Sequence, residues 1–203
     1  MANFDDLLET LKRVAAVLRD ADLPFLLGGG LAVWARGGPE TEHDLDLMVK
    51  PENAERVLDA LAAAGFRTEK PPEAWLYKAW DGDLLIDVIF DPMGGPIDHA
   101  MFERADELEV QAVTMKVMAL EDVMVTKLLA MREHEVDYED VLEIARALRE
   151  QIDWNTVWRE TSDSPYARAF FYLAEQLDVL GERRASSSES GSSRAPSEAA
   201  RRA

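Results

Sequence analysis

The stretch Gly-Gly-Leu-Ala-Val-Trp-Ala-Arg-Gly-Gly-Pro-Glu-Thr-Glu-His-Asp-Leu-Asp, residues 29–46, carries the strongest structural signal in this chain. It ends in Asp44-Leu45-Asp46, within an apolar run that extends to Val49. Alternate side chains of an extended strand share a face, so both carboxylates point one way while Leu45 and Leu47 point into a core. Two neighbouring carboxylates repel each other, and a divalent cation with oxygen ligands, usually Mg²⁺, relieves that repulsion.

The glycine pair that opens this stretch predicts a close approach of the backbone to a bulky ligand. Gly29 and Gly30 follow the apolar run Phe25-Leu26-Leu27. Glycine lets a backbone turn come close to an anion such as a triphosphate, because it has no Cβ. A glycine turn followed by Asp-x-Asp on a strand therefore predicts chemistry on a metal-bound nucleotide.

This stretch resembles the glycine and aspartate motif of the nucleotidyltransferase superfamily of DNA polymerase β. In that superfamily an apolar-Gly-Gly/Ser segment precedes Asp-apolar-Asp. The resemblance is greatest to the minimal nucleotidyltransferases, in particular the AbiEii/MenT-like toxin group, and it covers roughly residues 23–148. Segment 84–90 resembles the strand with the third carboxylate of the family. Segment 120–130 resembles its LEDL-x-x-x-KL-x-A helix, and Asp137-x-x-Asp140 resembles the D-x-x-D motif that follows.

Three positions differ from many relatives in this resemblance. Those relatives have Ser at the second glycine, Arg near residue 40 and Thr just before the aspartate pair. This chain has Gly30, Glu40 and Glu42-His43 at these places. The differences concern the contacts to phosphate or acceptor, and they leave a non-catalytic NTP-binding module as an alternative.

The resemblance implies a catalytic site with two Mg²⁺ ions and a bound NTP. Glycine backbone would cradle the phosphates, three carboxylates would hold the metals, and one lysine would neutralise the triphosphate. The residues at these positions are Gly29 and Gly30 for the phosphates, Asp44, Asp46 and Asp87 for the metals, and Lys127 for the triphosphate.

Asp87 and Lys127 also stand out without the resemblance. Asp87 is the only polar residue in the run 84–90, where a lone buried carboxylate is costly without a partner. Lys127 has only apolar neighbours three and four positions away, so it lies in the apolar stripe of its helix. An anion would explain this lysine; snorkelling to the surface is the alternative. Asp137 fits either a contact with Lys127 or a helix N-cap.

The composition predicts a folded protein without disulfides. The chain has 203 residues, 47% of them hydrophobic and none of them cysteine. It contains no run of about 18 apolar residues that would span a membrane. The N-terminus is acidic where a signal peptide would be basic. We therefore expect a cytoplasmic protein with no membrane partner.

The charge argues against general binding of nucleic acids. The net charge is −18, and residues 1–181 carry 17 basic against 37 acidic residues, a net of −20. Affinity for a phosphate backbone comes largely from Lys and Arg. We expect no non-specific binding of RNA or DNA.

The hydrophobic periodicities predict an α+β fold with a nucleotidyltransferase-like mixed β-sheet and flanking helices. We expect a catalytic core over residues 1–118, a C-terminal helical part over 119–181 that packs on it, and a disordered tail over 182–203. Expected strands include 24–28, 44–49, 84–90 and a single strand over 109–118. Expected helices include 4–20, 31–36, 120–133 and 137–150.

The sequence thus predicts a Mg²⁺-dependent transfer of NMP from an NTP to a hydroxyl group. The toxin resemblance implies tRNA as the acceptor and a protein antitoxin as a partner. An antibiotic nucleotidyltransferase that modifies a small hydroxylated drug is the alternative within the same class. His43 and His99 are weaker candidates for nucleotide contacts, and Trp75, Tyr77 and Trp80 fit sheet packing better than base stacking.

Overall fold

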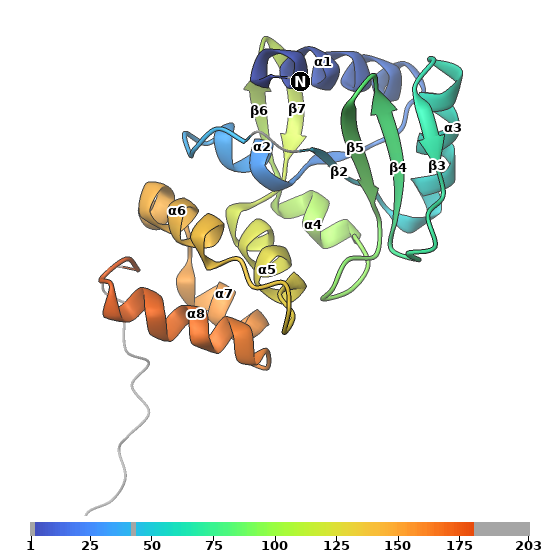
Figure 1. The fold of residues 1–203 in the computed structure, drawn as a ribbon. Coiled ribbons are helices and arrows are strands. Elements are labelled where there is room, and N and C mark those ends of the chain that lie inside the picture. The colour runs from blue at the N-terminus through green and yellow to red at the C-terminus, as the bar shows by residue number, and fades with distance from the viewer. Residues whose placement is uncertain (1–2, 42–43, 181–203) are drawn as a thin grey trace, which may run out of the picture.

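A seven-stranded mixed sheet with helices around it forms the body of the protein (Figure 1). The computed structural model describes residues 3–41 and 44–180. The tail predicted for 182–203 and the candidate His43 lie outside the described residues. The strands run in the order β3-β4-β5-β2-β1-β7-β6. Their bounds are β1 Leu26–Leu27, β2 Leu45–Met48, β3 Arg67–Glu69, β4 Leu76–Asp81, β5 Leu84–Ile89, β6 Asp106–Val110 and β7 Val113–Val117.

The described helices surround this sheet and continue into a C-terminal group. Helices α1 and α3 pack against each other beside the sheet, and α5 to α8 gather beyond its opposite end (Figure 1). The α-helices are α1 Phe4–Asp20, α2 Gly29–Trp34, α3 Ala54–Ala63, α4 His99–Arg104, α5 Leu120–Ala130, α6 Tyr138–Leu148, α7 Trp154–Thr161 and α8 Pro165–Gln176. Two 3-10 turns cover Pro51–Asn53 and Arg149–Gln151. The predicted α+β class is confirmed.

Parallel pairing in the middle of the sheet positions the aspartates. Strand β2 pairs in parallel with β5, and the register places Asp46 beside Asp87. Leu45 and Leu47 are fully buried on the other face, as the alternation predicted. The β4–β5 hairpin turns at Gly82, which has φ +61°, in agreement with the Asp81-Gly82 turn signal.

The single strand predicted over 109–118 is wrong. The structure has a hairpin there, in which β6 pairs antiparallel with β7. The turn residues Gln111 and Ala112 both adopt left-handed conformations, with φ of 52° and 60°. Asn and Gly are the usual residues at such positions, so this turn has no sequence signal.

Helix α5 is enclosed by several elements. It contacts α2, α6, α7 and α8. Leu120, Val123, Met124 and Leu128 are buried in it, so little of its surface reaches solvent. The helix ends at Ala130, three residues before the predicted end. None of the described helices combines the length and the apolar character that crossing a bilayer requires.

Candidate functional site

The aspartates on and beside β2 and β5 form a cluster of negative charge. Asp44, just before β2, and Asp46, its second residue, are partly buried, and Asp87 on β5 is 8% exposed. The negative charges of Asp44 and Asp87 both repel the carboxylate of Asp46. The structure therefore brings together the three carboxylates that the sequence predicted for the metals.

The pKa of Asp46 reports this crowding. It is raised from an ordinary 3.8 to about 7, chiefly by loss of hydration and also by repulsion from Asp44 and Asp87. Lys127 and Lys78 act in the opposite direction and do not offset it. A carboxylate in this state gains from a divalent cation, because the cation favours the charged form.

Asp87 has a cationic partner that sequence reasoning missed. Lys78 on β4 lies opposite Asp87 in the antiparallel register, and its Nζ is 3.1 Å from Asp87 Oδ1. Burial raises the pKa of Asp87, Lys78 lowers it, and nearby Asp44 raises it further. Strand pairing creates this contact, so the local sequence around Lys78 gave no signal of it.

The glycine pair lies against the aspartate strand. Gly29 has φ +52°, and a Cβ on it would be 1.7 Å from Asp46 Oδ2. A Cβ on Gly30 would be 2.7 Å from Thr41 Oγ1. Both glycines belong to the first turn of α2, so the predicted helix start at residue 31 is too late. The close approach of protein side chains accounts for glycine here, and a phosphate contact remains a prediction.

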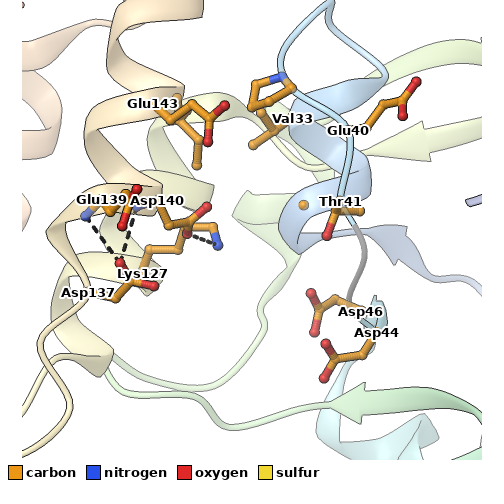
Figure 2. A pocket seen from close by; sticks show the side chains of 13 residues that line it. Val33, Glu40, Thr41, Asp44, Asp46, Lys127, Asp137, Glu139, Asp140 and Glu143 are labelled. Carbon is orange, nitrogen blue, oxygen red and sulfur yellow. Dashed lines mark hydrogen bonds and ion pairs between the residues drawn. The ribbon is translucent and has the colours of Figure 1, made fainter.

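A cavity of about 490 Å³ opens beside the cluster (Figure 2). Gly30, Thr41, Asp44 and Asp46 line one side of it. Lys127 from α5 and acidic residues from the N-terminal half of α6 line the other side. The cavity therefore joins Asp44 and Asp46 to Lys127, whereas Asp87 and Gly29 are not among its lining residues.

Lys127 is bound in an ion pair on the cavity wall. Its Nζ is 2.7 Å from Asp140 Oδ2, with side-chain exposures of 27% and 44%. Asp137 instead caps α6, because its Oδ1 accepts from the backbone N–H groups of Glu139 and Asp140 at 3.1 and 3.2 Å. Of the two roles open for Asp137, the structure therefore shows the N-cap.

The carboxylates fit a divalent metal in chemistry, although their arrangement is not that of a ready-made site. Among the described residues, no group of three His, Asp or Glu side chains is arranged to hold a metal ion. The ion pair with Lys78 occupies one oxygen of Asp87. Three repelling oxygen donors, one with a pKa near neutrality, nevertheless match the hard ligands that Mg²⁺ prefers.

The other candidates do not reach the cavity. His99 begins α4 and pairs with Glu103 at 3.4 Å. The ring of Tyr77 packs on Phe90, and Arg67 lies 3.7 Å from the ring centroid of Trp80, in agreement with sheet packing. Among the described residues lining the cavity there is no aromatic side chain.

Comparison with known families defines the class of this protein. The chain belongs to the family described as uncharacterised nucleotidyltransferase, whose model matches residues 5–180. The protein is therefore an enzyme of the nucleotidyltransferase class, a class that generally uses divalent metal ions. No curated protein matches the chain.

Solved structures show the same fold at low sequence identity. The solution structure of the antibiotic-resistance factor ANT(2'')-Ia has a TM-score of 0.57 and 16% identity, covering 84% of this chain and 96% of that one. A putative nucleotidyltransferase from Thermotoga maritima has a TM-score of 0.51 and 14% identity, covering 60% and 82%. The lincomycin-bound lincosamide adenylyltransferase LnuA has a TM-score of 0.50 and 14% identity, covering 67% and 92%.

Proposed function

We propose that this enzyme transfers a nucleoside monophosphate from an NTP to a hydroxyl group of a small molecule, and that it depends on Mg²⁺. The observation that carries the proposal is the register of β2 and β5, which sets Asp46 beside Asp87 with Asp44 close by. The cavity next to them is large enough for part of a nucleotide and an acceptor. Ligand pockets typically measure about 300–1,000 Å³.

In the proposed reaction the acceptor oxygen attacks the α-phosphorus of the NTP. A bond forms between this oxygen and phosphorus, the α–β phosphoanhydride bond breaks, and pyrophosphate leaves with the bonding electrons. Asp44, Asp46 and Asp87 would hold two Mg²⁺ ions, which supply charge stabilisation for the attacking and leaving oxygens. Asp87 would accept the proton of the acceptor hydroxyl.

The remaining site residues position the triphosphate. Lys127 would exchange its contact with Asp140 for a phosphate oxygen. Gly29 and Gly30 would offer backbone N–H groups at the start of α2. Catalysis of this kind consists mainly of positioning and electrostatic stabilisation, which these groups can provide.

A second acceptor class, the tRNA acceptor end, rests on the toxin-like sequence of α5 and α6. The segment 120–130 and the pair Asp137 and Asp140 match the pattern of the toxin group. In this version an antitoxin would neutralise the protein. Incubation with labelled NTP, Mg²⁺ and total tRNA tests it directly, since labelled tRNA is the expected product.

The function itself is tested by ligand-induced stabilisation and by turnover. A ligand present at 100 times its Kd and bound only by the native state stabilises it by about 2.7 kcal/mol. Mg²⁺ with ATP, GTP, CTP or UTP should raise the melting temperature of the wild type. Asp44→Ala combined with Asp46→Ala should abolish that shift and the release of pyrophosphate, while the variant remains folded. A wild type that responds to none of these nucleotides contradicts the proposal.

A further inference from the structure

A row of charged side chains extends from the candidate metal site across the sheet to its edge. Strand pairing places Asp46 of β2 beside Asp87 of β5. Lys78 of β4 lies on the other side of Asp87, and Glu69 of β3 lies beyond Lys78. Directly opposite residues of antiparallel strands share a face, with Cβ atoms about 5 Å apart. Lys78 is therefore a cation with a carboxylate on each side of it.

The face of the sheet that carries this row is the less covered one. Helix α3 packs on β3, β4 and β5. It covers the opposite face, where Ala79, Ile86 and Val88 are fully buried. On the face of the row, the side chain of Lys78 is 28% exposed and Glu69 is exposed. The ammonium group of Lys78 therefore reaches solvent, and its flexible stem can change direction there.

Lys78 holds the carboxylate that the proposed function assigns to a metal. Its Nζ is 3.1 Å from Oδ1 of Asp87, whose side chain is 12% exposed. The charge of Lys78 also lowers the pKa of Asp46, so it acts on both strands of the candidate metal site. An ammonium group and a metal ion compete for the lone pairs of the same carboxylate, and they repel each other. A metal that binds fully to Asp87 therefore has to displace Lys78.

Glu69 offers Lys78 a second partner on the far side of β4. The strands on either side of β4 are each about 4.8 Å away, so the two carboxylates are similarly placed for the lysine. Glu69 forms no ion pair within the part of the chain that the structure describes. Arg67, the cation on the same face of β3, lies over Trp80 instead, 3.7 Å from the ring centroid. Glu69 is therefore available to Lys78.

We propose that Lys78 is a positioning residue of the metal site, which holds Asp87 until a metal binds and then moves to Glu69. This inference rests on the proposed function, because it concerns the metal that Asp87 would hold. The movement exchanges one ion pair for another, and no covalent bond changes. It balances the charge of Asp87 before a metal arrives, and it removes a repelling ammonium group once the metal is bound.

The experiment measures the affinity of the nucleotide-free protein for Mn²⁺ by electron paramagnetic resonance. Mn²⁺ takes the same carboxylate ligands as Mg²⁺ and is directly detectable. Lys78→Met removes the competing ammonium group, and the Kd for Mn²⁺ should fall by about tenfold, the size of effect that one neighbouring charge has on a carboxylate. Glu69→Gln removes the second partner and should raise the Kd about threefold, the size of one exposed ion pair.

A double variant separates a movement of the lysine from a general effect of charge. In Lys78→Met the glutamate has no lysine to receive, so the added change Glu69→Gln should leave the Kd for Mn²⁺ unchanged. Glu107→Gln is the matched control, because Glu107 is an exposed glutamate opposite Lys116 in the β6–β7 hairpin, at the other edge of the sheet. This control should bind Mn²⁺ as the wild type does.

A Kd that does not fall in Lys78→Met would overturn the inference, as would a wild type that binds no Mn²⁺. An equal effect of Glu69→Gln with and without Lys78 would contradict it too, because Glu69 would then act by charge alone. If Lys78→Met is too unstable to measure, an unchanged Kd in the exposed variant Glu69→Gln decides against the proposal.

The thermal shift with Mg–NTP separates this inference from the proposed function. A wild type that Mg–NTP stabilises, combined with any of the contrary Mn²⁺ results, leaves the proposed function in place and removes only the role of Lys78. Absence of that stabilisation in the wild type would remove the proposed function and this inference together.

Discussion

Asp46 on β2 is the register partner of Asp87 on β5, so two carboxylates come from adjacent parallel strands. Such strands lie about 4.8 Å apart, a spacing that the main-chain hydrogen bonds maintain. The backbones of the two residues therefore cannot move apart without disruption of the centre of the sheet. Protonation, a neighbouring cation such as Lys78, or a metal ion relieves the repulsion of their carboxylates.

The raised pKa of Asp46 predicts a pH dependence of stability in the metal-free protein. The folded state holds this proton up to about pH 7, whereas an unfolded aspartate releases it near 3.8. The contribution is thus fully present below pH 3.8 and is lost as pH rises through 7. Asp46→Asn should remove this loss, so that its free energy of unfolding in EDTA falls less between the unfolded pKa of 3.8 and the folded pKa of about 7.

Urea denaturation across that range measures the effect. Asp59→Asn, an exposed change on α3, should follow the wild-type pH profile. Saturating Mg²⁺ should make the pH dependence of the free energy of unfolding more alike in wild type and Asp46→Asn, because a bound cation replaces the proton. Parallel profiles for wild type and Asp46→Asn in EDTA would show that Asp46 ionises normally.

Substitution of Lys127 should reduce activity far more than stability. Lys127→Met removes an ammonium group from a partly exposed ion pair, which costs about 1 kcal/mol or less. Loss of a charge that faces the triphosphate should lower kcat by about 10²-fold. Asp140→Asn breaks the same ion pair but keeps the lysine, so it should remain active. Equal losses of activity in both variants would assign Lys127 to structure alone.

Substitution of Gly29 and of Gly82 distinguishes the cost of a strained backbone from the effect of a steric clash with Asp46. Gly29 and Gly82 have φ of +52° and +61°, but only Gly29 lies against another side chain, that of Asp46. Gly82→Ala should cost about 1–2 kcal/mol of stability and keep full activity. Gly29→Ala should carry the same cost and also displace Asp46, with loss of Mg–NTP stabilisation. If Gly29→Ala binds Mg–NTP normally, the position of Asp46 is not critical.

Removal of Lys78 should destabilise the protein in a way that a second substitution repairs. Lys78→Met leaves the buried Asp87 carboxylate without its cation, and we expect a loss of about 2–3 kcal/mol at pH 8. The added change Asp87→Asn removes the unpaired charge and should restore most of that stability. Urea denaturation of the two single variants and the double variant gives the coupling energy. Additive losses would mean that the two groups do not interact.

The sequence predicted best what depends on local patterns. The alternation around Asp44 and Asp46 predicted their shared face, and the isolation of Asp87 in an apolar run marked it as a candidate site residue. Lys127 was a candidate site residue because it interrupts the apolar stripe of its helix. Each of these signals is contained within a few residues of the chain.

Features created by pairing or packing were not predicted. Lys78 faces Asp87 only through the strand register. The β6–β7 hairpin turns at Gln111-Ala112 without a turn-forming residue. Strain in that turn is offset by the strand pairing on both sides, and this information is non-local.

Arg36 holds one end of the cavity wall in place through two hydrogen bonds. Its Nη2 donates to the carbonyl of Val117 at 3.1 Å, just before α5, and its own carbonyl accepts from Gln151 Nε2 at 3.4 Å. The end of α2 is thereby fastened to the start of α5 and to the segment after α6. The opposite end of α6 is held to α5 through Lys127 and Asp140. In the proposed function a triphosphate would take Lys127 from Asp140, so nucleotide binding would remove one contact at this end of α6 while the Arg36 contacts at its other end stay in place.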